Sequence, residues 1–83
     1  MQQHGIVVQT NMVTGRFAVR VEDGSHVLAE QLDMQPLRMG EALSGRMDMV
    51  GPEVLADTNT AHHYSVSILA YGLSLEAIEE ELR

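Results

Sequence analysis

Three of the five arginines are the residues best suited to recognising an anion, because a guanidinium group donates paired hydrogen bonds to a phosphate or a carboxylate. Arg16 and Arg20 are four residues apart, which places both side chains on one face of a strand. We expect Arg46 to project from the outer face of a later strand. The three arginines would then form one positive patch if the first strand lies between the strand of Arg16 and Arg20 and the strand of Arg46. The alternative is that each arginine forms an ion pair on a solvated sheet face. The neighbouring carboxylates are Glu22, Glu30 and Asp48.

Two methionines are candidates for contacting a partner. The chain has six methionines and only three aromatic residues, so most methionines are expected to fill gaps in an aliphatic core. Met12 and Met34 differ because both fall in predicted turns, where an apolar side chain has little reason to be buried. Flexible methionine side chains adapt to a partner's surface.

The remaining reactive residues do not form a recognisable catalytic or metal-binding motif. His62 and His63 adjoin a polar loop that includes Asp57, but adjacent residues of a strand point to opposite faces and a transition metal needs three or four converging ligands. Serines occur without a Gly-x-Ser-x-Gly elbow, and no glycine-rich phosphate loop is present. We therefore expect no enzyme activity, no cofactor and no metal.

Composition predicts one acidic domain over residues 1–83, with a formal charge of −7, no lysine and no cysteine. The charge opposes nonspecific binding to nucleic acid and to anionic membranes. The lack of cysteine excludes disulfides and thiolate metal sites. We predict neither a signal peptide nor a membrane-spanning segment, and expect a cytoplasmic protein.

Alternation of apolar and polar residues predicts the strands that position these side chains. In residues 16–22, Phe17, Val19 and Val21 would face the core, while Ala18 would share the solvent face with the arginines. Residues 64–70 repeat the pattern, with Tyr64 and Ala70 among the inward positions. Further strands are predicted at residues 6–10, 27–32 and 43–49, with a short sixth candidate at 54–56.

Turn and helix signals complete the predicted fold. Asp23-Gly24 is typical of a tight hairpin, and Gly51-Pro52 is expected to end the fourth strand. Ser74 is a predicted helix N-cap, and residues 74–83 would form a helix with an acidic outer face. Its apolar stripe, which must dock on the barrel or on a partner, is Leu75, Ile78 and Leu82. The prediction is a mainly β protein, a small antiparallel barrel of five or six strands with a short C-terminal helix.

Residues 15–30 read Gly-Arg-Phe-Ala-Val-Arg-Val-Glu-Asp-Gly-Ser-His-Val-Leu-Ala-Glu. Together with Gly5 and Gly40-Glu41, this string resembles small oligonucleotide-binding-fold proteins over residues 5–49, most of all bacterial initiation factor one and, more distantly, cold-shock domains. The resemblance implies an oligonucleotide-binding type of barrel and binding of RNA or single-stranded DNA. Such proteins stack bases on exposed aromatic side chains. If Phe17 faces the core, the outer face of its strand offers only arginine planes for stacking.

From these observations we predict a noncatalytic interaction module that binds a protein partner or self-associates. The contact would use an exposed strand edge, the Met12 and Met34 loops or the terminal helix. The alternative is a nucleic-acid-binding barrel that uses Arg16, Arg20 and Arg46 with the loops near residues 11 and 58–63.

Overall fold

The alternating residues of the predicted strands form one closed core. In the computed structural model, which describes residues 2–83, the side chains of Phe17, Val19 and Val21 are buried, as predicted. Buried residues from the other strands pack against them, and Met47 joins them from the segment that follows β4. The remaining members of this cluster are Val7, Val27, Ala29, Leu43, Leu55, Tyr64, Val66 and Ile68.

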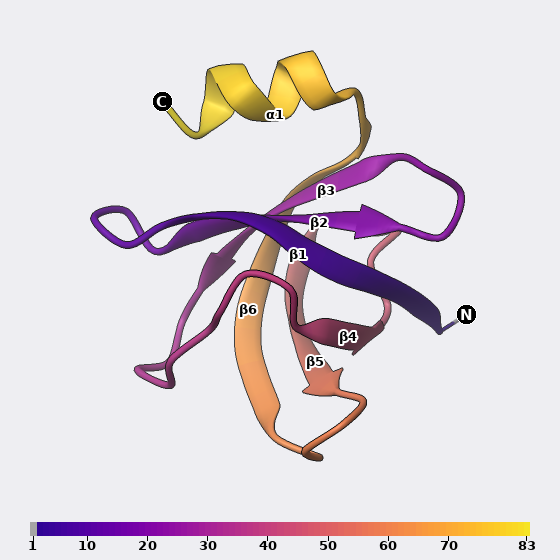
Figure 1. Ribbon diagram of the computed structural model, residues 1–83, viewed down its shortest axis with the longest axis vertical. Coiled ribbons are helices and arrows are strands. Elements are labelled where there is room, and N and C mark those ends of the chain that lie inside the picture. Colours follow the sequence, from indigo (N-terminus) through magenta and orange to yellow (C-terminus); the bar gives the residue numbers. More distant parts are fainter. Residues whose placement is uncertain (1) are drawn as a thin grey trace.

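Six antiparallel strands surround this core and close into a barrel in the order β1-β2-β3-β6-β5-β4 (Figure 1). The sequence did not decide between five and six strands. The short candidate at residues 54–56 is part of a full strand. The strands are β1 (Gln3–Asn11), β2 (Arg16–Val21), β3 (His26–Gln31), β4 (Ala42–Gly45), β5 (Gly51–Asp57) and β6 (His63–Leu73).

Strand β1 closes the barrel because it pairs with β2 along one edge and with β4 along the other. Gly5 is the crossing point, opposite Val21 on β2 and Leu43 on β4. A Cβ atom at Gly5 would overlap the Val19 side chain and lie 2.8 Å from the Arg20 carbonyl oxygen. Only glycine therefore lets β1 approach β2 this closely.

The predicted hairpin between β2 and β3 is confirmed. Gly24 has a positive φ of 88°, the conformation for which glycine is favoured in a tight turn. The Asp23 carboxylate accepts hydrogen bonds from the Ser25 backbone N–H at 2.8 Å and from the Ser25 hydroxyl at 2.6 Å.

The prediction for residues 43–52 was wrong in its boundaries. β4 ends at Gly45, so Met47 is buried beyond the strand and Met49 is half exposed. Gly51 and Pro52 begin β5 rather than end β4. β4 pairs with β5 only at Ala56 and Asp57, so Pro52 lies where one side of β5 forms no ladder, and a proline is tolerated there.

Helix α1 (Leu75–Glu81) covers part of the outer surface of the barrel (Figure 1). The Ser74 hydroxyl accepts a hydrogen bond from the Ala77 N–H at 3.2 Å, which confirms the predicted N-cap. Ile78 is fully buried in a second apolar cluster with Ala18 and Leu28. No helix within residues 2–83 is long and apolar enough to cross a membrane.

This second cluster explains three errors in the predicted faces. Ala18 is buried rather than exposed because it lies under Ile78. Ala70 packs in this outer cluster rather than in the core, because an irregularity in the β3–β6 ladder shifts the register between Ala29 and Leu28. Leu75 is 49 % exposed, so only the rest of the predicted stripe is docked.

We predict that Gly5→Ala destabilises the barrel. The added methyl group must displace β1 from β2, and overpacking of this kind costs about 1–3 kcal/mol. Urea unfolding should show a lower midpoint than the wild type. Ser65→Ala, on an exposed strand position, should leave the midpoint nearly unchanged, and a similar loss in both variants would contradict the close approach.

Candidate functional site

Met12 and Met34 come from different loops but line the same groove. Met12 lies in the β1–β2 loop and Met34 in the β3–β4 loop, and their exposed fractions are 94 % and 99 %. The partly buried Leu37 contributes apolar surface to the same hollow, and the buried Phe17 lies at its base. We call it the Met12–Met34 groove. Its lining is Thr10, Asn11, Met12, Val13, Thr14, Gly15, Arg16, Phe17, Gln31, Asp33, Met34, Gln35, Pro36 and Leu37.

The β1–β2 loop is held by the side chain of Asn11. Its Oδ1 atom accepts hydrogen bonds from the backbone N–H groups of Val13, at 3.0 Å, and Thr14, at 3.3 Å. Its Nδ2 atom donates to the Leu82 carbonyl at 3.3 Å, which links the loop to the end of the helical segment. The backbone N–H of Gly15 donates to the Asn11 carbonyl and closes the turn. Met12 and Val13 are thus exposed apolar residues on a turn of fixed shape.

The residues on both sides of Met34 are bonded to β6. The Asp33 carboxylate accepts a hydrogen bond from the Ser65 backbone N–H at 2.7 Å. The Gln35 side-chain amide donates to the His63 carbonyl at 2.6 Å, and its backbone N–H donates to Asp33. Met34 is therefore held at the tip of a loop that the barrel fixes in place.

These hydrogen bonds also keep Asp33 ionised. Burial acts to raise its pKa, but hydrogen bonds from the Ser65 N–H, the Gln31 side chain and Gln35 outweigh burial and lower the pKa. The Gln31 amide donates to Asp33 Oδ1 at 2.6 Å. Because these donors occupy both carboxylate oxygens, Asp33 acts as an anchor for the loop.

Of the three arginines in the predicted patch, Arg16 alone lines the Met12–Met34 groove. Arg16 and Arg20 form no ion pair with any residue in the 2–83 range. Arg46 lies beyond the end of β4, not on its outer face, because the strand stops at Gly45. Its guanidinium is 3.5 Å from the carboxylate of Asp48, as the ion-pair alternative predicted.

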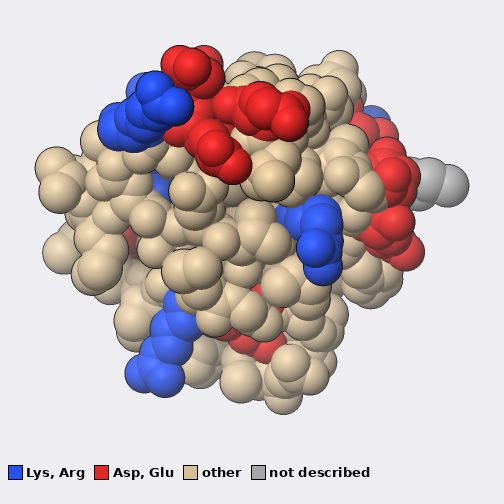
Figure 2. Space-filling view, turned by 45° about the horizontal axis from the view of Figure 1, so that its top comes forward, with Lys and Arg blue, Asp and Glu red and all other residues tan. Residues whose placement is uncertain are grey.

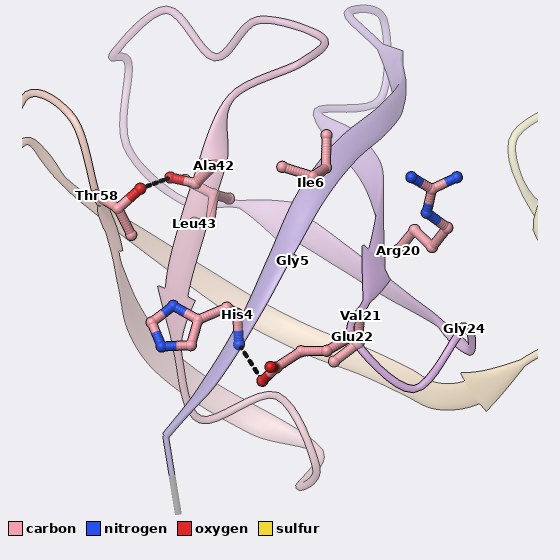
Figure 3. A pocket seen from close by; sticks show the side chains of 10 residues that line it. All are labelled: His4, Gly5, Ile6, Arg20, Val21, Glu22, Gly24, Ala42, Leu43 and Thr58. Atoms are coloured by element: carbon pink, nitrogen blue, oxygen red, sulfur yellow. Dashed lines mark hydrogen bonds between the residues drawn. The ribbon is translucent and has the colours of Figure 1, made fainter.

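Strand β1 does lie between β2 and β4, but the arginines stay separate. Arg16 and Arg20 are four positions apart along β2, a distance of roughly 13 Å along the strand. Figure 3 shows Arg20 in another pocket, around β1, with its guanidinium pointing away from His4. In that pocket Glu22 accepts a hydrogen bond from the His4 backbone N–H at 3.2 Å. Figure 2 shows basic side chains standing apart, with acidic ones gathered over α1.

A further polar cluster was missed in the sequence, where only its loop residue Asp57 and the adjacent histidines were noticed. The buried Tyr64 hydroxyl donates to Glu41 Oε2 at 2.7 Å, and Glu41 Oε1 accepts from the Arg38 backbone N–H at 2.6 Å. Asp57 Oδ1 accepts from the Asn59 N–H at 2.7 Å. These contacts tie loops to the barrel.

The same contacts account for the acidity of Asp57. A hydrogen bond from the Asn59 N–H lowers its pKa, as do the Thr60 N–H and the charge of His62, whereas burial acts in the opposite direction. Across residues 2–83, no three histidine or carboxylate side chains are placed to hold a metal ion.

No family model, curated protein or solved structure matches this chain. The resemblance to initiation factor one and cold-shock domains stays a prediction from the sequence. The function is therefore inferred from the groove, its loops and the distribution of charge.

We predict a loss of stability at high pH that depends on Tyr64. Burial, and then the hydrogen bond and charge of Glu41, raise the pKa of Tyr64 from 10.0 to about 12. The folded state favours the neutral phenol, so this contribution is complete below pH 10 and is lost as the pH rises toward 12. The chain has no lysine, whose ammonium group would otherwise lose its proton in the same interval.

The measurement is urea unfolding at pH 9 and pH 11.5. Tyr64→Phe should be less stable than the wild type by about 1 kcal/mol at the lower pH, because the bond to Glu41 is lost. Its stability should change less between the two pH values. Tyr71→Phe, at a half-exposed position, should keep the wild-type pH dependence, and the reverse result would rule out Tyr64 as the source.

Proposed function

We propose that this protein is a noncatalytic interaction module that binds a partner protein through the Met12–Met34 groove. The observation that carries the proposal is the convergence of two almost fully exposed methionines, from loops far apart in the sequence, on one groove. Exposed apolar clusters of this kind mark binding surfaces.

The loops are arranged for binding before a partner arrives. Asn11 fixes the turn that carries Met12 and Val13, and Asp33 and Gln35 fix the loop that carries Met34. Preorganised loops lose little entropy on association, so more of the favourable free energy of burial remains as affinity. Burying one methionine side chain contributes about 1.5–3 kcal/mol.

The charges of the groove define the partner's surface. Arg16 is its one basic residue and has no ion pair among residues 2–83, whereas Asp33 is occupied by hydrogen bonds. The matching partner presents apolar side chains to the methionines and a carboxylate to Arg16. A peptide or protein surface supplies both groups.

Two features favour a protein partner over a nucleic acid. The arginines are dispersed over separate pockets on a chain with a formal charge of −7, so they offer no continuous track for phosphates. Phe17, the aromatic side chain of the groove, is buried in the core and has no free face for a base.

We predict that a photo-crosslinking amino acid at position 34 captures a specific protein in the native lysate. The same amino acid at position 75, another exposed apolar site outside the groove, should not capture it. Met12→Ala combined with Met34→Ala should weaken binding of the purified partner at least tenfold, given the area lost. Capture of the same protein from both positions, or of none from position 34, would contradict the proposal.

We also predict no binding of single-stranded DNA or RNA, even at a low salt concentration of about 50 mM, where phosphate contacts are strongest. Fluorescence anisotropy with labelled oligonucleotides measures this. Micromolar binding that weakens with salt and disappears in Arg16→Ala combined with Arg20→Ala would instead support a nucleic-acid-binding barrel.

A further inference from the structure

Strand β1 has a backbone edge that no neighbouring strand covers. Its ladder with β4 stops at Ile6, whereas its ladder with β2 continues to Asn11. On the β4 side, Val7 forms two more backbone hydrogen bonds to the β3–β4 loop, at 3.0 and 2.7 Å. Residues 8–11 therefore have a paired strand on one side only, and Figure 1 shows this end of β1 continuing past β4 to the β1–β2 loop.

The backbone of Thr10 points toward this open side. Neighbouring residues of a strand direct their N–H and carbonyl groups to opposite edges. The Asn11 carbonyl points to the β2 side, because it accepts a hydrogen bond from the Gly15 N–H at 2.9 Å. Thr10 therefore directs its N–H and its carbonyl away from β2, and within residues 2–83 no backbone group of a loop bonds to them.

This open edge forms part of the Met12–Met34 groove. Thr10 and Asn11 line the groove together with Leu37 of the β3–β4 loop, and the hollow has a volume of about 540 Å³. Thr10 is paired with the buried Phe17, so its side chain lies on the inner face of the sheet, toward the base of the groove. The free backbone groups of Thr10 thus border a hollow that is open to a ligand.

Free backbone groups distinguish between kinds of occupant. An apolar helix laid over Thr10 would remove water from its N–H and carbonyl without replacing their hydrogen bonds, which is unfavourable. An extended peptide replaces both bonds, because its own backbone presents a carbonyl and an N–H at the spacing of a strand. An unpaired strand edge is therefore suited to binding an extended peptide.

We propose that the partner enters the groove as an extended peptide that adds a strand to β1, an inference that rests on the proposed function of the groove. Side chains of the added strand that share the sheet face of Thr10 meet the apolar lining near Leu37. The alternate side chains share the face of Arg16. The added strand lies about 10 Å from β2, so a glutamate on it and the Arg16 side chain can meet across β1.

The free edge is short, so strand addition by itself is weak. Residues 8–11 span about 13 Å and pair with about four residues of a peptide. We expect a dissociation constant of about 0.1–1 mM for a short peptide, which the side chains of a natural partner would improve.

The position of the C-terminus allows a test that needs no known partner. The Asn11 side chain donates to the Leu82 carbonyl, so the last residues of the chain lie beside the groove. The probe is the segment Val-Thr-Val-Glu-Val-Thr, joined after Arg83 by a flexible linker of about ten glycine and serine residues, which spans roughly 17 Å. Tethering gives an effective concentration in the millimolar range. The control probe has Pro-Pro in place of the central Val-Glu, because proline has no N–H to donate.

Hydrogen exchange measured by NMR on the full chain is the readout. The first probe should slow exchange of the Thr10 N–H at least threefold relative to the Pro-Pro probe, while the Asn11 N–H, on the β2 side, changes less. Arg16→Ala should reduce this protection about twofold, because it removes the contact with the glutamate of the probe. Arg20→Ala, a matched loss of charge outside the groove, should leave the protection unchanged.

Equal exchange of the Thr10 N–H with both probes would overturn the inference, as would protection that Arg20→Ala reduces and Arg16→Ala does not. The cross-linking test at position 34 is separate from this one. A partner captured there keeps the groove as a binding site even when the probe leaves Thr10 unprotected, and strand addition alone then fails.

Discussion

The two ladders of β1 are the constraint on which the rest of the structure depends. By pairing with β2 and β4 at once, this strand joins the two ends of the sheet and closes it. Closure divides the side chains into an interior, which Phe17 fills, and an exterior, to which Arg20 belongs. It also gathers the loops at the rims of the barrel. The groove exists because two of these loops share one rim.

Short polar side chains convert this framework into defined loops. Asn11, Asp33 and Asp57 each accept hydrogen bonds from backbone N–H groups that lie two or three residues farther along the chain or on another strand. Without such bonds, loops rich in exposed apolar residues would collapse onto the barrel or move freely. The arrangement keeps the side chains of Met12 and Met34 exposed to water. Binding a partner would therefore remove a large apolar area from water, which is energetically favourable.

The sequence predicted the features that depend on neighbouring residues and missed those that depend on distant ones. Period-two alternation identified β2 and its inward residues, and Asp23-Gly24 identified the hairpin, because both signals are local. The burial of Ala18 requires a helix 60 residues away, so no local pattern could reveal it. The strand that was expected to present Arg46 ended early at Gly45.

The candidate site likewise combines features that the sequence predicted with features that it missed. The turn position of Met12 and Met34 predicted their exposure, whereas their meeting in one groove follows from strand order. The bond between Tyr64 and Glu41 joins residues 23 positions apart and had no signal in the sequence.

The contact between Asn11 and the Leu82 carbonyl has a practical consequence for handling the protein. It brings the last residues of the chain beside the turn that carries Met12. An affinity tag or fluorescent protein fused after Arg83 would therefore emerge next to the groove and obstruct it. An immobilised sample intended for interaction screening is better attached through an engineered cysteine elsewhere on the barrel, since the chain contains no cysteine of its own to compete for the label.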